Sequence, residues 1–317
     1  MTAPRPRILI DCDPGHDDLF AIAVASKHCD VVGITSVAGN SPLTNTTRNA
    51  LIATDLFGLT HVPVHAGASG PLDGSTGHFA TEEHGRTGLD GPEPREPSRH
   101  ADGDDAVSYL IETIRAEEGL WLIPVGPLTN VALALRAAPD IARRVAGISL
   151  MGGSITHGNV TSAAEFNVWF DPEAAAEVFA SGAPLKMCGL DLTHQVTANA
   201  EFTDALAAHG TDVATFCAGL LTYYQAYAAR VWRKTGAEAR LVGAALHDPC
   251  AIMAITHPQL FETQRLHVVV ETEGRHTRGM TLADVRPWAD PQNANVDVVM
   301  RADGPTAVQV IFDAVVG

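Results

Sequence analysis

The chain has 317 residues and 46% hydrophobic residues, without a break in composition, so we expect a single α/β domain over residues 1–317. Its formal net charge of −16 argues against nucleic acid or an anionic membrane as a partner, and no apolar stretch approaches the roughly 20 residues of a membrane span. The N-terminus lacks a signal-peptide core, and five cysteines without a C-x-x-C pair indicate reduced thiols in a cytoplasmic protein.

The first predicted elements surround a turn that is rich in acidic residues. Residues 7–10 predict a buried strand, and apolar residues at helical spacing predict a helix over residues 19–28. Four carboxylates lie between them: Asp11, Asp13, Asp17 and Asp18. They repel one another unless a cation is present, and oxygen ligands suit Ca²⁺ or Mg²⁺. The alternative is that Asp17 and Asp18 only cap the helix, with Asp11 and Asp13 in a solvated turn.

Strands and helices then alternate along the chain. Strands are predicted over residues 31–38, 62–66, 120–125, 147–151 and 184–189, and helices over residues 44–56, 104–118, 131–136 and 172–181. This alternation predicts an open, doubly wound fold with a mostly parallel central sheet and helices on both faces. Ligands of such sheets bind at the carboxyl ends of the strands.

Two segments of this region are predicted as loops. Residues 154–170 form a polar loop, and residues 67–102 are rich in Gly, Pro, Ser, His and Glu. A loop as long as the second is usually a functional lid or disordered, so we expect residues 67–102 to be a mobile active-site loop. Within it His84 either covers a site or is a mobile surface histidine.

The last third of the chain adds further helices. Helices are predicted over residues 200–208, 213–234, 251–255 and 305–316, and strands over residues 266–271 and 296–300. Tyr223 and Tyr227 share one face of a helix, which favours a packing role over contact with a ligand. Asp248 precedes Pro249 as a helix N-cap does. His247, beside this acid, is able to titrate near neutral pH.

The polar side chains at the predicted strand and helix ends have one chemical character. They are acidic or amide, and none is basic: Asp13, Asp17, Asp18, Asn40, Asn159, Glu165, Asn167 and Asp248. Such a set suits a hard cation and the hydroxyl groups of a neutral sugar, whereas a phosphate site requires Lys, Arg or a glycine-rich anion nest. Neither a P-loop nor a G-x-S-x-G elbow is present in the sequence.

A series of motifs resembles one known family. In chain order they read D-x-D-P-G-x-D-D (11–18), G-N (39–40), H-G-x-[ST]-G-L-D-G (84–91), G-P-L-T-N (126–130), M-G-G (151–153), G-N-x-T-x-x-A-E-F-N (158–167), H-D-P (247–249) and G-x-T-x-x-D (279–284). From residue 7 to about residue 300 the chain therefore resembles the inosine–uridine-preferring nucleoside hydrolases. Arg86 departs from the residue that the family often has in the H-G motif, which leaves the preferred base open.

The resemblance implies Ca²⁺-dependent hydrolysis of the N-ribosidic bond of ribonucleosides to free base and ribose, in nucleoside salvage. It implies a homodimer or homotetramer and a nucleoside-hydrolase-like fold. It also implies a role for each matching residue. The implied Ca²⁺ ligands are Asp13, Asp18, Asp248 and the backbone carbonyl of Val125. The implied ribose-binding residues are Asp17, Asn40, Met151 through its backbone, Asn159, Glu165, Asn167 and Asp248. Asp13 would take a proton from a Ca²⁺-bound water, His247 would protonate the leaving base, and His84 would line the base pocket.

Two other functions use the same acidic residues. A haloacid-dehalogenase-type phosphohydrolase would use Asp11 as nucleophile and Asp13 as acid with Mg²⁺, but Pro14-Gly15 interrupts that motif and Lys186 is the only candidate for its lysine. A non-catalytic, Ca²⁺-dependent ribose-binding protein is the second alternative. It would not need an ionisable His247 beside a metal ligand.

Overall fold

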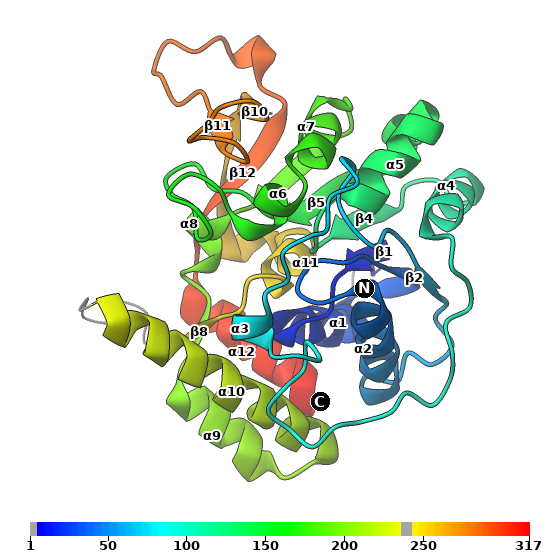
Figure 1. Ribbon diagram of the computed structural model, residues 1–317, viewed down its shortest axis with the longest axis vertical. Helices are drawn as coiled ribbons and strands as arrows, with labels where there is room; N and C mark the ends of the chain where they lie inside the picture. The colour runs from blue at the N-terminus through cyan, green and yellow to red at the C-terminus, as the bar shows by residue number, and fades with distance from the viewer. Residues whose placement is uncertain (1–4, 236–242) are drawn as a thin grey trace.

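The computed structural model describes residues 5–235 and 243–317, and its centre is an eight-stranded sheet (Figure 1). In spatial order the strands are β3 (Val64–Ala66), β2 (Asp30–Ser36), β1 (Arg7–Cys12), β4 (Trp121–Pro124), β5 (Gly147–Met151), β6 (Leu185–Cys188), β12 (Val296–Ala302) and β9 (Phe261–Leu266). All neighbouring strands are parallel except β12 and β9. The predicted doubly wound α/β fold with a mostly parallel sheet is confirmed.

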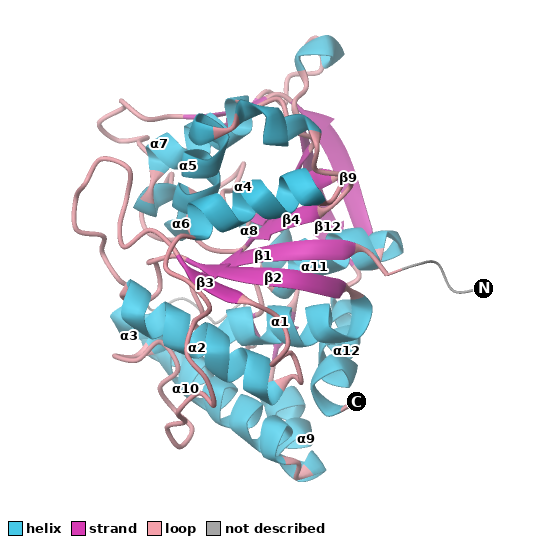
Figure 2. Cartoon of the chain, turned by 90° about the vertical axis from the view of Figure 1, so that its right-hand side faces the viewer, coloured by secondary structure: helices cyan, strands magenta, loops and turns pink. Residues whose placement is uncertain are grey.

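Helices cover both faces of this sheet (Figure 2). On one side lie α1 (His16–His28), α2 (Leu43–Leu56), α9 (Ala200–His209), α10 (Asp212–Thr235), α11 (Pro249–Thr256) and α12 (Gly304–Val316). On the other lie α4 (Ala106–Ala116), α5 (Thr129–Ala137), α6 (Phe166–Phe170) and α7 (Pro172–Ala180). Short elements complete the chain: α3 (Thr81–His84), α8 (Leu190–Thr193), β7 (Thr197–Ala198) paired with β8 (Ala244–Ala245), and β10 (Val268–Val270) paired with β11 (Thr281–Ala283).

The alternation of side chains along β1 explains how two cores form. Ile8 and Ile10 belong to the core beneath α1, whereas Leu9 belongs to the core beneath α4 and α5. All three side chains are fully buried, because successive residues of a strand point to opposite faces. A strand buried on both faces is continuously apolar, as residues 8–10 are, and its polar residues come only where the strand ends.

Two details of the predicted elements are wrong. The loop predicted over residues 154–170 ends in the helix α6, because Glu165 caps it by accepting bonds from the N–H groups of Asn167 and Val168, at 3.0 and 3.2 Å. The strand predicted over residues 266–271 is observed as the shorter β10, which pairs with β11, and the polar β9 just before it, which forms the sheet edge, was not predicted. An edge strand tolerates polar residues, so its composition did not reveal it.

The segment 67–102 is less loop-like than its composition predicts. It contains the short helix α3, and side chains of the main domain bind its backbone. The N–H of Ala68 donates to Asn130 Oδ1 at 2.8 Å, and Asn49 Nδ2 donates to the carbonyl of Thr87 at 2.8 Å. Its mobility stays a prediction. None of the helices in the described residues has both the length and the apolar character that crossing a membrane requires.

The buried Asp171 joins three parts of the fold, and its removal is a test of that role. Its carboxylate accepts bonds from Thr129 Oγ1 (2.7 Å), the N–H of Leu72 (2.9 Å) and the N–H of Ala174 (3.1 Å). We expect Asp171→Ala to lower the free energy of unfolding by about 2–4 kcal/mol, because two buried donors and a helix cap lose their acceptor.

Urea denaturation measures this loss, and Asp105→Ala is the matched control. Asp105 also caps a helix, accepting from the N–H of Ser108 at 2.9 Å, but it lies in solvent. We expect Asp105→Ala to lower the free energy of unfolding by only about 1 kcal/mol. Equal losses in the two variants would contradict the joining role of Asp171.

Candidate active site

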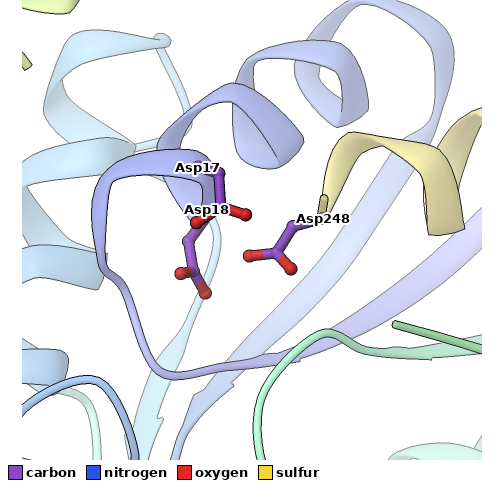
Figure 3. Close-up of side chains that lie close together, drawn as sticks. All are labelled: Asp17, Asp18 and Asp248. Atoms are coloured by element: carbon purple, nitrogen blue, oxygen red, sulfur yellow. The ribbon is translucent and has the colours of Figure 1, made fainter. Parts of the chain in front are cut away.

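The acidic turn after β1 meets the start of α11 at the carboxyl edge of the sheet. Asp17 and Asp18 lie in the first turn of α1, and Asp248 precedes α11. Because α1 packs against α11, one carboxylate oxygen from each of these three residues lies within 4.8 Å of the other two (Figure 3). The N–H of His247 donates to Asp17 Oδ2 at 3.2 Å, which links the two helix starts. The structure thus brings together acids that are 230 residues apart.

Asp13 lies beside this cluster and is also buried. Its Oδ2 accepts a short bond from the N–H of Asn40, at 2.6 Å, while its Oδ1 has no partner in residues 5–235 and 243–317. Two glycines make room for it, since a Cβ at Gly39 would come within 2.1 Å of Oδ2 and a Cβ at Gly126 within 2.5 Å of Oδ1. An unpartnered buried carboxylate oxygen is costly, so this atom requires a ligand or a proton.

Burial raises the pKa of all four carboxyls, and repulsion between carboxylates raises those of Asp13, Asp18 and Asp248 further. Burial, followed by repulsion between the carboxylates, raises the pKa of Asp18 to about 7. Burial also raises that of Asp17 to about 6, and those of Asp13 and Asp248 lie well above their usual range for the same causes. No Lys or Arg of the described chain forms an ion pair with any of the four. Hard oxygen donors without a cationic side chain fit a divalent cation.

Helix capping was the alternative explanation for these acids, and Asp18 both caps a helix and belongs to the acidic cluster. Asp18 accepts bonds from the N–H groups of Gly15 (2.9 Å) and Asp13 (3.2 Å). Its side chain therefore caps α1 and belongs to the cluster. The solvated turn of that alternative is contradicted, because Asp11 and Asp13 are buried. Asp11 accepts from Asn130 Nδ2 at 2.7 Å and lies outside the three-residue cluster.

A second polar group faces the acids from β4, β5 and α6. Asn167 Nδ2 donates to the carbonyls of Val125 (2.9 Å) and Met151 (3.2 Å), and so joins the ends of two neighbouring strands. Glu165 Oε2 accepts from the N–H of Gly153 at 2.8 Å. These bonds hold both side chains in one orientation, as a site for sugar hydroxyls requires.

A small cavity of about 40 Å³ lies between these two groups. Ten residues expected in the site line it: Asp17, Asn40, His84, Val125, Met151, Asn159, Glu165, Asn167, His247 and Asp248. The other two expected residues, Asp13 and Asp18, do not line the cavity. Both accept a hydrogen bond from Asn40, which does line it. We call this the inner cavity. Its polar wall contains carboxylates, amides and imidazoles, with no Lys or Arg among the residues named.

Four further residues of the inner cavity were missed from the sequence: Ala80, Glu83, Phe166 and Tyr224. Glu83 and Phe166 are adjacent to residues that the motifs identified, and this adjacency was the available signal. No signal in the sequence identified Tyr224, because the helical spacing pointed to Tyr223 and Tyr227 instead. Tyr223 instead stacks on His16 at 5.4 Å between ring centroids, outside the inner cavity. Gln225 donates to the carbonyl of Ala198 at 2.9 Å.

The two histidines of the inner cavity are held by different partners. His247 Nδ1 lies 2.7 Å from Thr193 Oγ1, and burial lowers the pKa of His247 to about 4. His84 Nδ1 accepts from the N–H of His16 at 3.1 Å, and burial lowers the pKa of His84 well below its usual range. The sequence suggested that His247, beside Asp248, titrates near neutral pH. This environment does not favour that, because the effect of burial on its pKa outweighs that of the neighbouring acid.

Known proteins resemble the chain over almost its whole length. The sequence profile of the inosine-uridine preferring nucleoside hydrolases matches residues 8–309. The pyrimidine-specific ribonucleoside hydrolase RihA of Escherichia coli O1:K1 / APEC is 42% identical over 309 residues, which cover 96% of this chain and 97% of that protein. The solved purine-preferring ribonucleoside hydrolase from Gardnerella vaginalis is 33% identical, with a TM-score of 0.90 over 98% of each chain. The plant nucleoside hydrolase PpNRh1 is 29% identical, with a TM-score of 0.91 over 99% of this chain and 100% of that one.

The raised pKa values of the cluster predict how stability depends on pH without a cation. A carboxyl whose pKa is higher in the fold than in the unfolded chain stabilises the fold while it is protonated, and this stabilisation is lost as the pH rises through the folded value. The pKa of Asp18 is raised from its ordinary value of 3.8 to about 7 in the fold, so in a strong chelator the wild-type protein is expected to lose stability between about pH 4 and pH 7 and to level off above that.

Asp18→Asn tests this expectation, because an amide does not ionise. Relative to the wild type, the variant is expected to gain about 1–3 kcal/mol of unfolding free energy between about pH 4 and pH 7, measured by urea denaturation in chelator. Asp105→Asn, a change at an exposed cap, is the control and should show no such pH-dependent gain. A constant difference between wild type and Asp18→Asn over this range would disprove the assignment.

Proposed function

This chain belongs to the inosine-uridine preferring nucleoside hydrolases and is an N-glycosyl hydrolase of nucleosides, and we propose that it uses Ca²⁺ to cleave the N-ribosidic bond of ribonucleosides. The observation that carries the proposal is the unpartnered Oδ1 of Asp13, buried beside three further carboxylates at a cavity with sugar-binding chemistry. We further propose a role in nucleoside salvage in the cytoplasm, and a homodimer or homotetramer, as the family resemblance implies.

The donor set fits Ca²⁺ in kind. Asp13, Asp18, Asp248 and the carbonyl of Val125 would hold the ion, all of them oxygen ligands. Asp17 shares the cluster of Asp18 and Asp248, and its carboxylate would accept a bond from a ribose hydroxyl. When bound, the ion supplies positive charge that promotes ionisation of the attacking water.

The remaining residues would act on the ribose and the leaving base. Breaking the N-ribosidic bond develops positive charge on the sugar ring, which the oxygens of Glu165 and Asn167 would stabilise, with Asn40 and Asn159 holding hydroxyl groups. Asp13 would accept the proton of the attacking water at its free Oδ1. His247 would donate a proton to the leaving base; burial lowers its pKa to about 4 in the free protein, so this role requires the bound nucleoside to favour the protonated ring.

Substrate entry would require the segment 67–102 to move. The inner cavity of about 40 Å³ has room for about three waters, which is less than a ribose needs. Ala80, Glu83 and His84 of that segment line the cavity. We propose that α3 and its flanking residues move away to admit the nucleoside and return over it.

Ribose release from cytidine, uridine, adenosine and inosine tests the activity and the metal. We expect release from at least one of them, its loss in a strong chelator, and its return with Ca²⁺ but not with Zn²⁺, since the ligands are hard oxygens. Activity that persists at full rate in chelator would overturn the Ca²⁺ proposal. Binding of ribose without turnover of any nucleoside would favour the non-catalytic alternative.

A second substrate distinguishes the proposed role of His247 from that of Asp13. We expect His247→Ala to lower kcat for a natural nucleoside by about 10²–10⁴-fold, because a general acid contributes that much, yet to lower kcat by less than about tenfold for p-nitrophenyl riboside, whose leaving group needs no proton. Asp13→Asn is expected to lower kcat for both substrates. His257→Ala, at the opposite end of α11, is the control. An equal loss on both substrates in His247→Ala would rule out general-acid catalysis by this residue.

A further inference from the structure

Glu83 lies at the junction of two cavities. Beyond the inner cavity is a larger one of about 940 Å³, which we call the outer cavity. Its walls include the aromatic side chains of Phe79, Trp169 and Tyr227. Glu83 and Tyr224 line both cavities. They are two of the six residues that line both cavities, so a group attached to a ribose in the inner cavity would pass beside them as it enters the outer one.

The carboxylate of Glu83 is short of hydrogen-bond donors. The Tyr224 hydroxyl donates a hydrogen bond to this carboxylate, and no other described residue does so. The nearest repelling charge is Asp17, and burial together with this repulsion raises the pKa of Glu83 to about 7. Arg230 does not compensate, because it faces Glu82 at 3.9 Å. One carboxylate oxygen of Glu83 is thus free to accept a bond from a ligand.

Nucleobases differ in what they offer such an acceptor. Cytosine and adenine carry an exocyclic amino group, which donates hydrogen bonds, where uracil and hypoxanthine carry a carbonyl oxygen, which accepts them. An ionised carboxylate only accepts, so it binds the amino group and repels the carbonyl. Contact with the aromatic side chains of the outer cavity does not make this distinction, because apolar surfaces discriminate weakly between groups of similar size.

We propose that Glu83, oriented by the Tyr224 hydroxyl, determines base specificity by accepting a hydrogen bond from the exocyclic amino group of the base. The enzyme then prefers cytidine to uridine and adenosine to inosine. This inference rests on the proposed hydrolysis of ribonucleosides and adds the class of base. Tyr224 is a positioning residue, since it acts by holding the Glu83 carboxylate.

The test compares substrate pairs in Glu83→Gln and wild type, at about pH 8 so that Glu83 is ionised in both the free and bound protein. A glutamine amide donates as well as accepts, so it binds a carbonyl as readily as an amino group. We expect the cytidine-to-uridine ratio of kcat/KM to fall by about tenfold or more, and the adenosine-to-inosine ratio to fall with it. Tyr224→Phe is expected to lower both ratios by a smaller factor, because the carboxylate remains.

Glu201→Gln is the control for loss of a negative charge. Glu201 is exposed in the first turn of α9 and lines neither cavity, so the ratios of this variant should stay within about twofold of wild type. Unchanged ratios in an active Glu83→Gln would overturn the inference while leaving the hydrolase intact. No ribose release by the wild type from any nucleoside would instead refute the proposed function.

A binding measurement covers the case in which Glu83→Gln turns over too slowly. Calorimetry with Asp13→Asn, in which chemistry is blocked, measures the Kd of cytidine and of uridine with and without the added Glu83→Gln change. We expect cytidine to bind about tenfold more tightly than uridine, and the added change to remove the difference. Equal Kd values before the added change would overturn the inference.

Discussion

Burial of four carboxylates without a neighbouring Lys or Arg is the constraint on which this structure depends. Asp13, Asp17, Asp18 and Asp248 come from two helix starts and one strand end, and only the packing of α1 on α11 brings them together. Backbone N–H groups satisfy part of their charge, and a divalent cation would satisfy the rest. Gly39 and Gly126 contribute by leaving space for Asp13, which no other residue would do.

In the proposed function, the groups that act on the ribose and the group that selects the base come from different parts of the fold. Asp13 follows β1, the other acids, Glu165 and Asn167 lie at the starts of α1, α6 and α11, and hydrogen bonds to the backbone orient Glu165 and Asn167. Glu83 and Tyr224 come from α3 and α10, which lie outside the sheet. Reaction geometry needs rigid supports, whereas the contacts to the base vary with the segments placed over the pocket. This arrangement allows one reaction to serve different bases.

Most of the fold follows from local patterns, and its errors have a common cause. Apolar strands buried on both faces and helices with capping residues were predicted within a few residues of their observed ends. The polar edge strand β9 and the short helix α6 were missed, because an edge strand needs no apolar run and a one-turn helix depends on a single cap from Glu165. In both, tertiary contacts outweigh local propensity.

The sequence by itself determined the chemistry of the site: the acidic turn at residues 11–18, the amide and acid residues at strand ends, and the His-Asp pair before α11. These follow from local signals, since strand ends and helix starts are where parallel α/β folds place ligands. Only the tertiary structure decided which atoms meet. The unpartnered oxygen of Asp13, the low pKa of His247 and the meeting of Glu83 with Tyr224 each depend on burial between segments far apart in the chain. Sequence spacing does not encode desolvation, and desolvation sets these properties.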